Sequence, residues 1–231
     1  MGVEGKLAPR LLIITKMSLL ARSAFLLLAL LPLPVAARAS EVTASAVVRE
    51  MNLARQDPAA YARLLEDVRA HSNGRFVVLP GQTTIYTHEG LGAVDEAIRF
   101  LRAAQPLQPL ALSPGMCRGA ADHCAEQAGG AIGHGDPASR MNRYGTWAAA
   151  WGENISYGKS SARDVVMALI IDDGLPARKH RANIFAAKFK YAGAAYGRHA
   201  RYGSVCSIDF AGAYFERGGQ TAESALVARN Y

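Results

Sequence analysis

The sequence predicts an α/β protein in which helices and strands form separate layers, and three observations lead to this prediction. Apolar residues recur at helical spacing in most segments between residues 43 and 173. Two segments near the C-terminus, 190–199 and 203–214, are typical of strands joined by a short connection. No internal repeat or low-complexity linker separates the two parts. We therefore expect one domain in which helices come first and strands last.

Composition and charge narrow the class of protein. Of the 231 residues, 50% are hydrophobic and 19% are charged, as in an ordinary globular domain. The formal net charge is +7, but residues 1–39 hold five basic residues and one acidic residue. The remainder therefore carries a charge of about +3 and has no basic cluster interleaved with aromatic residues. We expect no nucleic-acid partner.

Residues 1–39 are typical of an export signal, with Met17 as the expected start. A basic residue precedes a mostly apolar run, and Ala37-Arg38-Ala39 has the small-x-small pattern of a cleavage site. The residues before Met17 are either an upstream extension or part of the leader. Because Pro32 and Pro34 interrupt the run, cleavage is favoured over a retained membrane anchor. The mature chain is then expected outside the cytoplasm, extracellular or periplasmic, without a transmembrane segment.

Capping signals set the starts and ends of the expected helices. A first helix runs from Thr43 to the interruption at Asp57-Pro58, and a second follows it. A third covers 90–105, and the amphipathic spacing of its apolar residues indicates one buried face. The fourth begins at the cap Ser113-Pro114 and stops at Gly129-Gly130. Ser161 opens a fifth over 162–173.

The other segments are expected to be less regular. Residues 72–90 read as a loop with a short extended piece, and 174–185 as a turn into a short helical piece. Residues 130–160 are rich in Gly, Ser, Asn and aromatic residues and are expected to form a long irregular segment, which is often functional. In the last strand, alternation places Cys206, Ile208 and Phe210 on one face and Ser207 and Asp209 on the other.

The three cysteines do not form a paired framework, because their number is odd. If Cys117 and Cys124 share a helix, they lie roughly 10 Å apart along its axis, beyond the separation of about 7 Å that a disulfide tolerates. Any disulfide must therefore include Cys206. The alternative, which we favour, is three buried thiols that act as small hydrophobic side chains.

Four polar residues stand in contexts that secondary structure does not explain: His134, Glu153, Asp172 and His180. Two imidazoles and two carboxylates suit a divalent-metal site or a general acid–base pair. Their separations of 19, 19 and 8 residues match no short metal-binding motif, so a solvated histidine or a turn aspartate explains each one singly as well. The remaining histidines are expected to be structural, and no nucleophile-elbow, Walker or dinucleotide-binding motif is present.

A set of motifs resembles the CAP superfamily, which includes cysteine-rich secretory proteins, antigen 5 and pathogenesis-related 1 proteins and is also called the SCP domain. The motifs are "GH" at 133–134, "GENI" at 152–155, "HRANIF" at 180–185 and "CSIDFAGAY" at 206–214. The chain is most similar to a bacterial secreted branch. This resemblance implies a three-layer αβα sandwich, with helices flanking a mainly antiparallel sheet, over residues 40–215. Residues 216–231 would be a C-terminal tail.

The resemblance also implies a cleft tetrad. Position by position, its two histidines and two acids fall on His134, Glu153, Asp172 and His180, with Asp173 as the competing register for the second acid. His134 and His180 would bind zinc or another divalent cation. The chain departs from the family pattern at Asp172, where glutamate is more usual, and at Lys179, where glycine is more usual. Supporting residues would be Asn154, Arg181 and Asn183.

For function, the resemblance implies a secreted protein that binds a lipid or another small hydrophobic ligand. It implies no general enzymatic activity, and we name no catalytic residue. Two alternatives stay open. One is a metal-assisted hydrolase that uses the same cleft. The other is a non-catalytic interaction domain at the cell surface.

Overall fold

The computed structural model describes residues 1–2, 42–81 and 83–218. The predicted leader, with its cleavage site, lies outside the described residues apart from its first two positions, and so does most of the predicted tail. In the part that is described, no helix is both long and apolar enough to cross a bilayer.

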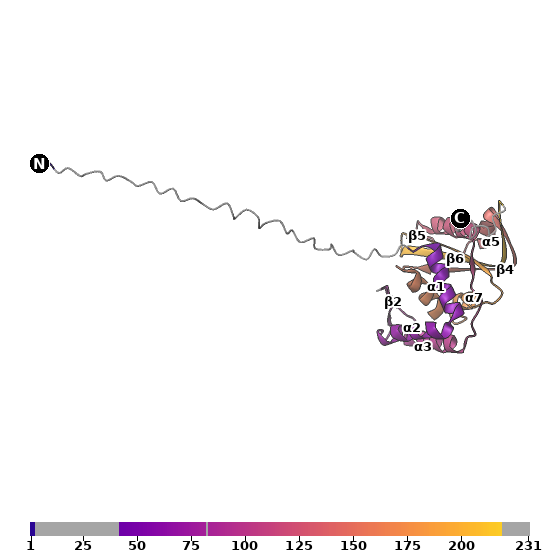
Figure 1. The fold of residues 1–231 in the computed structure, drawn as a ribbon, viewed down its shortest axis with the longest axis horizontal. Coiled ribbons are helices and arrows are strands. Elements are labelled where there is room, and N and C mark those ends of the chain that lie inside the picture. The colour runs from indigo at the N-terminus through magenta and orange to yellow at the C-terminus, as the bar shows by residue number, and fades with distance from the viewer. Residues whose placement is uncertain (3–41, 82, 219–231) are drawn as a thin grey trace, which may run out of the picture. The chain divides into compact units, whose positions relative to one another are not determined.

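A four-stranded sheet that includes β4, β5 and β6 forms the middle of the domain (Figure 1). Its strand order is β3-β5-β6-β4. β5 (Tyr191–His199) and β6 (Gly203–Glu216) form the antiparallel hairpin that the sequence predicts. β4 (Gly145–Tyr157) is antiparallel to β6. The short strand β3 (Ala111–Leu112) is parallel to β5 and was not predicted. β4 is therefore an edge strand of this sheet.

Helices cover both faces of the sheet, which confirms the expected three-layer α/β sandwich (Figure 1). α4 (Pro114–Gln127) and α5 (Pro137–Tyr144) pack on one face. α1, α6 and α7 pack on the other, and α2 and α3 lie beyond them. α1 spans Ala44–Gln56, α2 Pro58–Ala70, α3 Leu91–Ala103, α6 Ala162–Ile171 and α7 Lys179–Ile184.

The predicted caps position the helices that frame the site. Ser113 Oγ accepts a hydrogen bond from Met116 N at 3.1 Å, and Ser161 Oγ accepts one from Asp164 N at 3.0 Å. The predicted alternation in β6 also holds. Cys206 belongs to the large core cluster beneath α1 and α6, and Val205 belongs to a smaller cluster on the α4 side. Both faces of β6 are thus buried.

The predicted irregular segment at 130–160 is wrong over much of its length, because α5 and the 13-residue strand β4 occupy it. β4 is rich in residues with weak strand preference, and a bulge between Ala148 and Trp151 breaks its alternation. Ala149 has φ of 67° at this bulge. Glu153 therefore lies in a paired strand rather than in a loop.

The segment predicted as a loop with an extended piece contains a small separate hairpin. Its strands are β1 (Phe76–Val78) and β2 (Thr84–Tyr86). β2 contributes Ile85 and Tyr86 to a cavity beside the candidate site.

Candidate functional site

Glu153 lies on the α4 side of β4 and binds His134. Its side chain is 1% exposed, and its Oε1 accepts a hydrogen bond from His134 Nδ1 at 2.7 Å. His134 follows α4 in the loop before α5, and 54% of its side chain is exposed. A buried carboxylate thus orients a solvent-accessible imidazole.

The second oxygen of Glu153 binds Arg140, a residue of α5 that the sequence did not single out. Arg140 Nη2 donates to Glu153 Oε2 at 2.7 Å and to His134 O at 2.7 Å. The guanidinium is buried, so it balances the carboxylate charge away from water. Asp136-Pro137 is the cap signal from which α5 could have been found.

Asp172 and His180 form the second pair. Asp172 ends α6 in a left-handed conformation with φ of 54°, and its Oδ1 accepts from His180 Nδ1 at 2.7 Å. Its Oδ2 accepts from the backbone N–H groups of His180 at 2.9 Å and Arg181 at 3.3 Å. Asp173 instead accepts from His88 N and Glu89 N. Asp172, and not the competing Asp173, therefore faces the histidine.

The edge strand β4 links the two pairs. Because successive residues of a strand point to opposite faces, Asn154 lies on the α7 side while Glu153 lies on the α4 side. Asn154 Nδ2 donates to His180 O at 2.9 Å, and Asn183 Nδ2 donates to Asn154 Oδ1 at 2.9 Å. Arg181 of α7 connects this helix to α3. It forms an ion pair with Glu96, and its guanidinium lies over the Phe100 ring.

The pairs lie against β4 without forming a closed metal cage. Each imidazole uses Nδ1 for its carboxylate, which leaves Nε2 as the nitrogen able to bind a cation. Within residues 42–81 and 83–218, no group of three or more His, Cys, Asp or Glu side chains could hold a metal ion. His123, a buried residue of α4 that was expected to be structural, contacts Gly133 O and Gln127, and its Nε2 lies 3.9 Å from Glu153 Oε2.

An open cavity of about 550 Å³ lies beside the His180–Asp172 pair. β2, the end of β4, the end of α6 and the β5–β6 turn line it, and aromatic residues supply much of its wall. Tyr86, Leu175 and Tyr202 are 60%, 41% and 40% exposed in this lining. Exposed apolar residues around a hollow are typical of ligand-binding surfaces.

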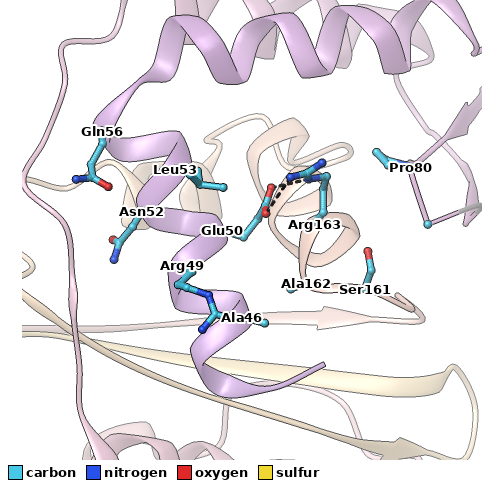
Figure 2. Close-up of a pocket in the computed structure, with 11 residues that line it drawn as sticks. Ala46, Arg49, Glu50, Asn52, Leu53, Gln56, Pro80, Ser161, Ala162 and Arg163 are labelled. Carbon is cyan, nitrogen blue, oxygen red and sulfur yellow. Dashed lines mark hydrogen bonds and ion pairs between the residues drawn. The ribbon is translucent and has the colours of Figure 1, made fainter. Parts of the chain in front are cut away.

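A larger cavity of about 670 Å³ lies between α1 and α6 and shares no lining residue with the first (Figure 2). Figure 2 shows Glu50 of α1 and Arg163 of α6 pointing toward one another across it. Their closest contact is 2.9 Å, and Glu50 also accepts from Tyr61 at 3.0 Å. Its central charges therefore satisfy each other, and the cavity beside His180 is the better candidate.

Asp209 is a further buried acid that the sequence placed only on a strand face. It pairs in register with Glu153, and both of its carboxyl oxygens are buried without a hydrogen-bond partner among the described residues. Burial first, and the nearby charge of Glu153 second, raise the pKa of Asp209 well above its usual value, although Arg140 opposes this. The geometry favours a neutral carboxyl beneath α4.

Comparison with known proteins gives one family. A family model described as the cysteine-rich secretory protein family, CAP, matches residues 69–210. A search of curated proteins finds no match. Among solved structures, a cysteine-rich secretory protein from Staphylococcus aureus matches with 14% sequence identity and a TM-score of 0.37. That match covers 53% of this chain and 38% of the staphylococcal chain.

Proposed function

The chain belongs to the CAP family of cysteine-rich secretory proteins, and from this we propose that it is an exported protein that binds a lipid or another small hydrophobic ligand. The observation that carries the proposal is the cavity of about 550 Å³ beside His180. Its volume lies in the range of small-molecule pockets, and its exposed aromatic rim suits an apolar ligand. The leader pattern of residues 1–39 supports export.

We further propose that His134 and His180 bind a divalent cation such as zinc. What supports this role is that each imidazole donates from Nδ1 to a buried carboxylate, which leaves Nε2 as the nitrogen that could bind a cation. Neutral imidazole nitrogen is a good ligand for zinc, copper and nickel. When bound, the cation would add a positive charge and open coordination positions to the cleft.

The hydrogen bonds of Glu153 and Asp172 favour ligand binding over hydrolysis as the function. Glu153 gives one oxygen to His134 and the other to Arg140. Asp172 gives one oxygen to the His180 ring and the other to two backbone N–H groups. A general base needs a carboxylate oxygen within reach of the proton it removes, and here the oxygens already hold structural partners.

Calorimetric titration of the apo protein with zinc tests the cation site. We expect His134→Ala and His180→Ala to abolish binding, and Glu153→Gln to weaken it by roughly 10- to 100-fold through the lost orientation of His134. His71→Ala, at an exposed histidine of the α2 terminus, is the matched control. If the double alanine variant at 134 and 180 binds as tightly as the parent, the cation site lies elsewhere.

Mass spectrometry of protein recovered from its native host tests the other two parts of the proposal. We expect a mature N-terminus near Ser40 in the exported fraction, and an organic extract that contains a bound apolar molecule. A soluble exported chain that retains residues 20–35 would contradict cleavage. An extract without such a molecule, together with no uptake of added lipid, would contradict the proposed ligand class.

A further inference from the structure

Asn73-Gly74 forms an exposed turn between α2 and the hairpin of β1 and β2. Asn73 N donates to Phe76 O at 3.0 Å, and Phe76 N donates to Asn73 O at 2.9 Å. Gly74 has φ of 60°, a conformation that glycine adopts without a steric penalty. A Cβ built on Gly74 would meet no atom within 4 Å. The peptide bond between the two residues is therefore open to water, and no side chain at position 74 shields it.

Two groups at this turn that can react with each other are both free of hydrogen bonds. Among the described residues, none bonds to the Asn73 side-chain amide or to the Gly74 backbone N–H. The side-chain amides of Asn52, Asn154 and Asn183, in contrast, all take part in hydrogen bonds. The Asn73 amide can therefore turn toward the backbone nitrogen that follows it.

We propose that Asn73 is a site of spontaneous covalent modification in the folded protein. The Gly74 nitrogen attacks Asn73 Cγ, and the Cγ–Nδ2 bond breaks. The amide proton leaves with Nδ2 as ammonia, and a five-membered succinimide ring remains. Water then opens the ring at either carbonyl, which gives aspartate or isoaspartate at position 73. Water is the only co-reactant, and nothing is oxidised or reduced.

The one other Asn-Gly or Asp-Gly pair in the sequence, Asp173-Gly174, shows what a protected pair looks like. The Asp173 carboxylate accepts hydrogen bonds from two backbone N–H groups. Gly174 N donates to Glu89 Oε1 at 2.8 Å. Both reacting groups are therefore engaged at this pair, whereas both are free at Asn73-Gly74.

The modification would act on the hairpin beside the candidate site. Either product adds a negative charge, and isoaspartate also lengthens the main chain by one carbon atom. The two backbone hydrogen bonds between Asn73 and Phe76 cannot both survive that insertion. Phe76 pairs with Tyr86 across the hairpin, and Tyr86 lines the cavity beside His180. Isoaspartate should therefore loosen one wall of this cavity.

Peptide mass spectrometry of the folded protein, incubated at mildly alkaline pH, tests the proposal. The tryptic peptide 70–75 should gain about 1 Da as an amide becomes an acid, and should convert roughly 10-fold faster or more than Asn142. Asn142 is the matched control, since it is exposed but lies within α5 and precedes the bulky Arg143. Asn73→Gln should stay unconverted, because its longer side chain closes a ring much more slowly.

The urea-unfolded chain is the reference for protection by the fold. If peptide 70–75 converts in urea but not in the folded protein, the turn protects Asn73 and the proposal is wrong. Conversion of Asn142 at the same rate as Asn73 would also overturn it. Hydrogen exchange of the isoaspartate fraction should be faster in β1 and β2 than in the parent. Freshly purified Asn73→Asp, which adds the charge without the extra carbon, should exchange more like the parent, and equal exchange in all three would contradict the effect on the hairpin.

Discussion

At the scale of single residues, Glu153 explains how a carboxylate can occupy a buried strand. One oxygen orients His134 and the other is neutralised by Arg140, so the acid is fixed on both sides. The sequence context of Glu153 and the resemblance of "GENI" to a known motif both pointed to this residue, but no local pattern pointed to Arg140. Its partners lie in three separate segments, and that convergence is created by tertiary packing.

Replacing Arg140 should be far more costly than replacing its neighbour on the same helix. Arg140→Met leaves the Glu153 charge buried and uncompensated, and we expect a loss of about 3–5 kcal/mol in the free energy of unfolding. Arg143→Met removes an ion pair whose arginine is 52% exposed, and should cost less than about 1 kcal/mol. Urea denaturation measures both. Equal small losses would show that Arg140 does not hold Glu153 in place.

Because of Asp209, the free energy of unfolding should decrease as pH rises. Its folded pKa is raised above the ordinary value of 3.8, so above that pH the folded chain keeps a proton that the unfolded chain has lost. The free energy of unfolding therefore decreases as pH rises from about 4 toward the folded pKa. Asp209→Asn removes this dependence and should gain on the order of 1–3 kcal/mol relative to the parent near pH 7.

Thermal and urea unfolding of the parent and Asp209→Asn at pH 4 and pH 7 provide the test. The gain should shrink as pH approaches 4, since both states of the parent then begin to hold the proton. Asp67→Asn, at an exposed acid of α2, is the matched control and should change little at either pH. A gain that is the same at both pH values would mean that Asp209 is charged in the folded chain.

At the scale of elements, the helices that begin at a capping residue recognisable in the sequence were predictable. Ser113 and Ser161 each begin a helix where the sequence indicates, because the capping hydroxyl and the backbone N–H that donates to it lie three residues apart. α5 was missed although Asp136-Pro137 carries the same signal, since its eight residues lie in a segment rich in loop formers. β4 was missed because pairing with β6 and a bulge, and not intrinsic preference, define it.

The close approach of α4 to β5 depends on Gly193. A Cβ at this position would lie 2.3 Å from the Met116 carbonyl carbon and 2.4 Å from Cys117 N, which are backbone atoms unable to move singly. Gly193→Ala should therefore displace α4 and lower the free energy of unfolding by about 1–3 kcal/mol or more. The displacement should also weaken zinc binding, since the loop after α4 carries His134.

Gly92→Ala provides the control within a helix. A Cβ at Gly92 meets no atom within 4 Å, and the residue lies in α3 with a backbone that alanine can adopt. We expect this variant to be as stable as the parent or more stable by up to about 1 kcal/mol. Chemical denaturation compares the two substitutions. Similar behaviour of both would argue against tight α4–β5 packing.

At the scale of the whole molecule, the layered fold was predictable from the sequence. The placement of the two histidine–carboxylate pairs on the two sides of β4 was not. Helical spacing and the final hairpin indicate the layers, and burial of both faces of β6 completes the sandwich. His134 and His180 lie far apart in sequence, and their carboxylates lie on or near opposite faces of an edge strand. This placement depends on the order of the strands in the sheet, and the spacing of apolar residues within one segment does not indicate that order.

The three cysteines allow the cooperativity of the domain to be measured. All are free thiols, which confirms that Cys117 and Cys124 on α4 are not bonded to each other. Cys117 is half-buried, whereas Cys124 and Cys206 are buried in core clusters on opposite faces of the sheet. Burial raises the pKa of Cys124 to about 11 and that of Cys206 further still, so neither is a reactive thiolate in the folded chain.

Pulsed alkylation across a urea gradient, read by peptide mass spectrometry, should label Cys117 first and then Cys124 and Cys206 together. The two buried thiols should become reactive at the same urea concentration, because one cooperative transition exposes both sides of a sheet that the two helical layers share. A reducing agent should not change the midpoint. If Cys124 reacts at lower urea than Cys206, the α4–α5 layer opens as a separate unit, and His134 would then lie on the less stable side of the cleft.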